Sequence, residues 1–108
     1  MRVHQGFEWD EPKAEKNLKK QGVSFDDAAR VLGDDDGDYF HVDEYDKPHS
    51  DGEDRYLTTA SHLDDRRIVL RIVWSDRSTD KAQITRIISA RPATPRERKN
   101  YAKEIGPH

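Results

Sequence analysis

The segment from residue 86 to residue 99 constrains the fold of this chain most, because it specifies a strand, a turn and a helix in succession. An apolar run ends on Arg91, and the proline that follows it favours a turn. Thr94 then stands at the N-cap of a helix, Pro95 in its first turn and Glu97 at the capping-box position. Five basic side chains lie in this segment, and they predict a surface that binds phosphate.

Two helices are predicted near the N-terminus, each with its own start and stop signals. Asp10 is an N-cap for a helix that begins near residue 11 and ends at Gly22. Ser24 caps a second helix, which ends at Gly33. Its apolar stripe has the spacing of one helix face and consists of Phe25, Ala28, Ala29 and Leu32. The C-terminal helix is expected to run from residue 95 to about residue 105.

Four strands are predicted between the second and the last helix, at residues 39–45, 55–61, 67–74 and 83–90. The third is apolar at nearly every position, which indicates a central strand covered on both faces. Short consecutive strands joined by polar turns form antiparallel meanders. We therefore predict an α+β fold with two N-terminal helices, a four-stranded antiparallel sheet and a C-terminal helix.

Composition limits the chain to one small domain over residues 1–108 and excludes several classes of site. No cysteine is present, so disulfides, thiolate catalysis and zinc fingers are excluded. The five histidines have no metal-ligand spacing, and we expect neither a metal nor a cofactor. No apolar run is long enough to cross a bilayer and no signal peptide is recognisable, so a cytoplasmic protein is expected.

The net charge of −3 conceals a strong separation of charge along the chain. Residues 34–54 contain ten acidic residues and one basic residue, and they are interpreted as an acidic hairpin insertion at the surface. Residues 66–104 contain eleven basic and four acidic residues. This second segment favours contact with nucleic acid despite the acidic isoelectric point of the whole chain.

Three segments carry a family resemblance: FEWDEPKAEKNLKKQGVSFDDAARVL, RRIVLRIVWSDR and RIISARPATPRERKNYAKE. Together they resemble the BrnT family of bacterial toxins, within the wider RelE/ParE-like ribonuclease toxin fold. The resemblance implies a type II toxin that cleaves RNA without a metal and arrests translation. It also implies a hetero-oligomer with a BrnA-type antitoxin, whose ribbon-helix-helix domain would bind operator DNA for the complex.

Metal-independent RNA cleavage needs a base for the 2′-hydroxyl, cations for the phosphorane and an acid for the 5′-oxygen. Arg91, at the end of the last strand, is the first candidate, as a clamp on the scissile phosphate. Its alternative role is a structural ion pair with Glu97 or another acid. Asp76 is predicted to position or deprotonate the hydroxyl while Arg77 stabilises the phosphorane. The alternative is an ordinary aspartate-containing turn.

Further residues are candidates for binding RNA. They are Arg71, Arg86, Lys13, Lys19, Lys20 and Trp9. Arg71 lies inside a strand and must either face a functional surface or pair with an acid. The lysines could follow a phosphate backbone or form a solvated helix face, and Trp9 could stack on a base or pack in the core. His4 and His62 are secondary candidates for proton transfer.

Two other functions remain open at this stage. The chain departs from the family pattern at Gln21, Trp74 and Asp76. These departures favour a catalytically weak or degenerate toxin that acts mainly by binding the antitoxin and repressing the operon. A third possibility is a nucleic-acid-binding domain that does not cleave.

Overall fold

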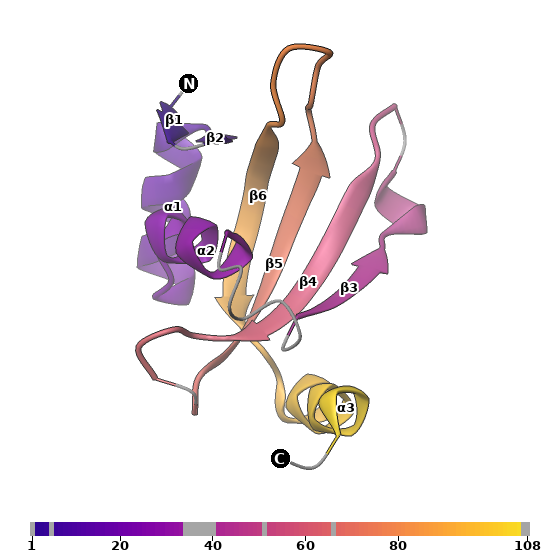
Figure 1. Ribbon diagram of the computed structural model, residues 1–108. Coiled ribbons are helices and arrows are strands. Elements are labelled where there is room, and N and C mark those ends of the chain that lie inside the picture. The colour runs from indigo at the N-terminus through magenta and orange to yellow at the C-terminus, as the bar shows by residue number, and fades with distance from the viewer. Residues whose placement is uncertain (1, 5, 34–40, 51, 66, 107–108) are drawn as a thin grey trace.

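The computed structural model describes residues 2–4, 6–33, 41–50, 52–65 and 67–106 (Figure 1). In chain order the elements are β1 Arg2–His4, β2 Phe7–Trp9, α1 Glu11–Gln21, α2 Phe25–Leu32, β3 Val42–Tyr45, the 3-10 helix η2 Lys47–His49, β4 Arg55–Ser61, β5 Val69–Asp76, β6 Thr85–Pro92 and α3 Pro95–Ile105. The α+β class and the three helices are confirmed, and each helix begins at its predicted position.

The sheet differs from the prediction. In the described part of the chain six strands lie in the order β1-β2-β6-β5-β4-β3. The four predicted strands are present and pair antiparallel, but the prediction that the sheet has only four strands is wrong, because β1 and β2 extend it. The two missed strands have three residues each, too few to show a period, and β2 pairs with β6 in parallel. A parallel neighbour requires a long crossover connection, which sequence periodicity does not reveal.

The acidic segment contributes an edge strand to this sheet. β3 pairs antiparallel with β4, as predicted for a short edge strand, and its described part starts at Val42. Residues 34–40 and 51 of the acidic segment lie outside the described residues. β5 and β6 run about two residues later than predicted, because their mutual pairing extends from Leu70 and Pro92 to Asp76 and Thr85.

One face of the sheet packs against α1 and α2 and forms the core. Strand side chains from β4, β5 and β6 meet the apolar face of α2, whose Ala28 is fully buried. The central members of this core are Trp9, Phe25, Ala28, Val31, Ala60, Leu70, Ile72, Ile87 and Ala90. The predicted stripe of α2 is confirmed except at Leu32, which is only partly buried.

Helix α1 also covers the edge of β6 beyond the short strand β2. The Asn17 amide donates to the carbonyl oxygens of Ala90 (2.8 Å) and Val23 (2.9 Å) and accepts from the Ala90 N–H (3.3 Å). One side chain therefore takes the place of a neighbouring strand. The unpaired edge of β6 is satisfied in this way.

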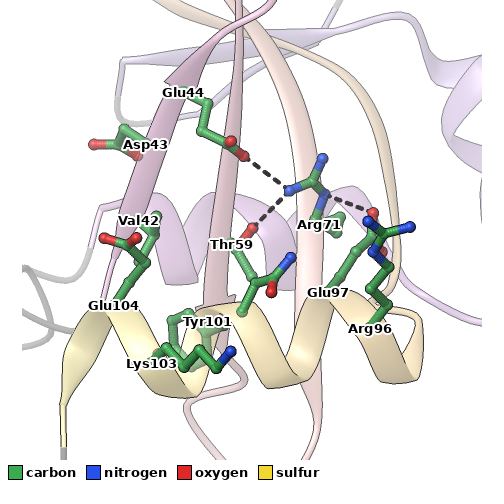
Figure 2. A pocket seen from close by; sticks show the side chains of 11 residues that line it. Val42, Asp43, Glu44, Thr59, Arg71, Arg96, Glu97, Tyr101, Lys103 and Glu104 are labelled. Atoms are coloured by element: carbon green, nitrogen blue, oxygen red, sulfur yellow. Dashed lines mark hydrogen bonds and ion pairs between the residues drawn. The ribbon is translucent and has the colours of Figure 1, made fainter.

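Helix α3 lies on the opposite face of the sheet, across the ends of the strands (Figure 2). Its start has the predicted capping box, in which Thr94 and Glu97 bond to each other's backbone N–H. The rest of this face carries arginines at matching registers, so we call it the arginine face. Its rows are Thr59–Arg71–Arg91, Leu57–Val73–Ser89 and Arg55–Ser75–Arg86.

A β-bulge sets which residues reach the arginine face. Val73 pairs with Ser89 and Trp74 with Ile87, so Ile88 is an extra residue in β6. Arg86 and Arg91 are five residues apart and would lie on opposite faces of a regular strand. The extra residue restores Arg86 to the face of Arg91, an effect that bulges commonly have.

Candidate functional site

The arginine face has two groups of charged side chains, one near each end of β5. The group under α3, which we call the α3 cluster, contains Arg71, Arg91, Glu97 and Glu44. Figure 2 shows Arg71 between Glu44 and Glu97. Arg91 and Glu97 form two parallel hydrogen bonds of 2.7 and 2.8 Å. This is the fork geometry that makes arginine–carboxylate pairs strong.

Arg71 is the more buried arginine of the α3 cluster, with 17% of its side chain exposed. Its Nε lies 3.2 Å from Glu97, and one terminal nitrogen donates to Glu44 at 3.0 Å and to Thr59 at 3.1 Å. The Glu97 carboxylate is therefore paired with two arginines, Arg71 and Arg91. The hydrogen bonds from Arg91 are the largest cause that lowers the Glu97 pKa from 4.5 to about 2.

These contacts decide between some of the alternatives predicted from the sequence. The ion pair of Arg91 with Glu97 and the pairing of Arg71 with acids are both confirmed. The role of Arg91 as a phosphate clamp stays a prediction. A cavity of about 620 Å³ opens beside the cluster between β3 and α3. Its charged lining is mixed: Asp43, Glu44, Glu97 and Glu104 against Arg71, Arg96 and Lys103.

Asp76 and Arg77 lie at the other end of β5. Five residues of extended chain separate Asp76 from Arg71, which is roughly 16 Å at ~3.3 Å per residue. The three residues predicted to be catalytic are thus divided between the two ends of the β5–β6 pair, with Arg91 at one end and Asp76 and Arg77 at the other. Asp76 accepts the Ser78 N–H at 2.9 Å, and bonding to Ser78 lowers the Asp76 pKa. The predicted aspartate turn is confirmed.

The second group of charged side chains lies at this end of the sheet and consists of Glu53, Arg55, Arg77 and Arg86. We call it the Glu53 cluster. Glu53 binds Arg77 at 2.9 Å and Arg55 at 3.4 Å through its two oxygens. Arg86 lies in the same cross-strand row as Arg55, with Ser75 between them. A cavity of about 160 Å³ in this region is lined by Asp10, Lys13, Glu53, Arg55, Arg86, Ile87 and Ile88.

Sequence reasoning missed Arg55 and Glu53. Arg55 occupies the first position of a predicted strand, where a charge is ordinary, and Glu53 belongs to an acidic segment interpreted as solvated. The one available signal was the alternation of Arg55, Leu57 and Thr59, which places the arginine on one face of β4. Which partners it meets there depends on sheet order.

The remaining RNA-binding candidates have different surroundings. Trp9 is 1% exposed and packs edge-to-face against Phe25, so the core alternative is confirmed and base stacking is not available to it. Lys13 lies in the first turn of α1 and lines the Glu53-cluster cavity. Lys19 and Lys20 are exposed in the last turn of α1, and their contact with RNA stays a prediction.

Trp74 and His62 have structural partners. The Trp74 ring stacks on Tyr56 with centroids 4.7 Å apart and donates to the Thr58 hydroxyl at 2.8 Å. His62 Nε2 lies 3.2 Å from Asp27, and its Nδ1 accepts the Asp64 N–H. Both ring nitrogens of His62 are thus engaged. The His4 side chain lies outside the described residues.

Among the described residues, no group of three or more His, Cys, Asp or Glu could hold a metal ion. In the same part of the chain, no helix combines the length and the apolar character needed to cross a membrane. The candidate site is therefore a protein surface of guanidinium and carboxylate groups. Its chemistry is the binding of anions and the stabilisation of negative charge.

A family model described as ribonuclease toxin, BrnT, of type II toxin–antitoxin system matches residues 9–97. The chain belongs to the BrnT family. No curated protein matches the sequence. The matched region includes both arginine clusters and ends on Glu97. A BrnT toxin acts as a ribonuclease with RNA as its substrate, and a type II system implies a protein antitoxin as its partner.

Proposed function

We propose that this BrnT protein is a metal-independent endoribonuclease that cleaves cellular RNA in the cytoplasm and thereby arrests translation. One observation supports this most. The chain belongs to a ribonuclease toxin family, and its strands place Arg55, Arg71, Arg86 and Arg91 on the same face of the sheet. When the 2′-oxygen attacks the phosphorus of a phosphodiester, negative charge develops on the phosphoryl oxygens. Guanidinium donors fixed by strands stabilise that charge without a metal.

The proposed reaction is an internal transesterification. The 2′-oxygen loses its proton to a base, attacks the adjacent phosphorus and displaces the 5′-oxygen, which takes up a proton. The products are a 2′,3′-cyclic phosphate and a 5′-hydroxyl. Asp76 is the proposed base, because its carboxylate is exposed at the end of β5 and Arg77 follows it directly in the chain. Arg77 is the proposed ligand of the phosphate that is cleaved, and Arg91, at the other end of the β5–β6 pair, is proposed to hold a neighbouring phosphate of the same RNA.

The proposed partner is a BrnA-type antitoxin with a ribbon-helix-helix domain. The type II assignment supports a protein partner. In this proposal the two proteins form a hetero-oligomer, the antitoxin covers the toxin, and operator DNA is bound only through the antitoxin.

The test is cleavage of RNA by the purified protein in the presence of EDTA. We expect products that end in 2′,3′-cyclic phosphate, and we expect growth arrest when the protein is produced without its antitoxin. Arg91→Ala should lose cleavage while its circular dichroism spectrum stays native. Cleavage that disappears in EDTA and returns with Mg²⁺ would refute the metal-independent mechanism. Full activity of a folded Arg91→Ala variant would remove Arg91 from it.

A second function is favoured by one observation. In the isolated chain Arg71 and Arg91 are both engaged by carboxylates, so the α3 cluster is close to neutral. A toxin with weak catalysis would then act mainly as an antitoxin-binding co-repressor. Gel-shift measurements with operator DNA, the antitoxin and the toxin distinguish the two. Enhanced operator binding without RNA cleavage under any condition would favour the co-repressor.

A further inference from the structure

The Glu53 cluster has the geometry of a phosphate site that the α3 cluster lacks. Arg55, Ser75 and Arg86 occupy one row across β4, β5 and β6, all on the arginine face. Arg55 and Arg86 both line the cavity of about 160 Å³, whereas Ser75 between them is fully buried. Lys13 approaches the same cavity from the start of α1.

Several donors in this row have no partner within the described part of the chain. The Ser75 hydroxyl is fully buried and has no hydrogen bond there. Arg86 likewise makes no ion pair or hydrogen bond with its side chain among the described residues. Arg86 is partly exposed and lines the cavity, so an anion bound there would give its guanidinium group a partner.

The β-bulge gives a second, independent indication. A regular β6 would turn Arg86 away from the arginine face, and the extra residue Ile88 turns it back. The bulge interrupts the β5–β6 ladder, which is otherwise the longest in the sheet together with β4–β5. Because of the bulge, Arg86 lies in the same cross-strand row as Ser75 and Arg55.

The two clusters also differ in what a phosphate would have to displace. At the α3 cluster it would compete with Glu97, which is held by Arg91 through two hydrogen bonds and by Arg71 through an ion pair. At the Glu53 cluster Arg86 can receive an anion without breaking an existing bond. Glu53 contacts Arg55 and Arg77 with separate oxygens and so fixes both guanidinium groups beside the cavity.

We propose that the phosphodiester to be cleaved binds to Arg55, Arg86 and Arg77, with Lys13 at the rim and Glu53 as the positioning residue for Arg55 and Arg77. This inference rests on the proposed ribonuclease function and assigns its substrate site. It leaves Arg91, in the α3 cluster, to hold a neighbouring phosphate of the same RNA, while the ion pair of Arg91 with Glu97 supports the C-terminal helix.

The test uses two RNAs of identical sequence in EDTA: an unmodified one for single-turnover cleavage, and a fully 2′-O-methylated one that binds but lacks the attacking hydroxyl. Arg86→Gln is the central variant, because Arg86 has no partner among the described residues and its loss should leave the fold intact. Arg30→Gln is the control for the loss of one positive charge, since Arg30 is exposed on α2 and pairs with Asp27 and Asp64 rather than with a residue of the Glu53 cluster.

We expect Arg86→Gln and Arg55→Gln to slow cleavage by about 100-fold. They should also weaken binding of the methylated RNA about tenfold and reduce the slope of its salt dependence by about one. Arg30→Gln should stay within about twofold of the wild-type protein. Glu53→Gln should bind the methylated RNA as well as the wild type or better, yet cleave more slowly, and Glu53→Asp should recover part of the rate.

Two outcomes separate the failure of this inference from the failure of the proposed function. Wild-type cleavage with normal rates in Arg86→Gln and Arg55→Gln, but loss of activity in Arg71→Gln, would overturn the substrate site and leave the ribonuclease intact. Absence of both cleavage and RNA binding in the wild-type protein would overturn the function and the site with it. Equal loss of binding and cleavage in Glu53→Gln, with reduced thermal stability, would show that Glu53 is structural.

Discussion

Glu97→Gln is the substitution that best tests how the α3 cluster stabilises the fold. Glutamine keeps one acceptor oxygen and can still complete the capping box with Thr94. It removes the charge that binds Arg91 through two hydrogen bonds and Arg71 at 3.2 Å. The change therefore isolates the ionic contribution and leaves the helix cap in place.

The Glu97 pKa gives the magnitude. It falls from 4.5 to about 2 on folding, which at ~1.4 kcal/mol per pH unit corresponds to ~3 kcal/mol in favour of the ionised carboxylate. Glu97 is 20% exposed, but Arg91 is 38% exposed and water screens part of the attraction. We therefore expect Glu97→Gln to lower the free energy of unfolding by ~2–3 kcal/mol at pH 7, or the Tm by roughly 10 °C or more.

The pH dependence supplies the sharper measurement. Because the folded pKa is lower than the unfolded one, Glu97 contributes its full stabilisation above pH 4.5 and loses it as the pH falls towards about 2. Urea unfolding of both proteins between pH 7 and pH 2.5 should show a difference that shrinks over that interval. Other carboxylates titrate in the same range, and subtracting the two curves removes their contribution.

Glu104→Gln provides the control from the same helix. Glu104 is exposed and makes no ion pair or hydrogen bond with the described residues. Its substitution should change the stability by no more than ~0.5 kcal/mol. If Glu97→Gln and Glu104→Gln are equally stable, or if their difference does not depend on pH, the ionic account of the α3 cluster is refuted.

Three further substitutions test other parts of the structure. Asn17→Ala should destabilise the fold by ~1–3 kcal/mol in urea unfolding, because both backbone groups of Ala90 lose their partner; a loss below ~0.5 kcal/mol would contradict the edge-covering role of α1. Trp74→Phe should cost ~1 kcal/mol, since the ring keeps its stacking but loses the bond to Thr58, and an unchanged Tm would count against that bond. Asp76→Asn should preserve the turn and the Tm while greatly reducing single-turnover RNA cleavage, whereas an unchanged rate would exclude Asp76 as the base.

Local signals in the sequence determined the helices of this protein. Asp10, Ser24 and Thr94 each accept a backbone hydrogen bond from the residue three positions later, so each cap is complete within a few residues of chain. The helix bounds follow from those contacts and from the glycines that end all three helices. Helix starts can be predicted for this reason: the atoms that decide them are neighbours in the sequence.

The sheet and the site depended on contacts between distant segments. Strand β2 is too short to recognise, and it is stabilised by a parallel neighbour almost eighty residues away, at Thr85. The bulge at Ile88 reversed the face expected for Arg86 from strand alternation. Register also separated the proposed catalytic residues Asp76 and Arg91 and brought Arg55 into the row of Arg86.

The sequence by itself determined where the helices of this protein begin. It also determined that arginines are the main side chains available for its chemistry, because the chain has no cysteine and few histidines. Only the tertiary structure decided how those arginines are used. A carboxylate binds whichever guanidinium the fold brings within about 3 Å, so Glu97 engages Arg91 and Arg71 while Arg86 has no described partner. That distribution follows from strand order and register, which are set by packing across the whole sheet.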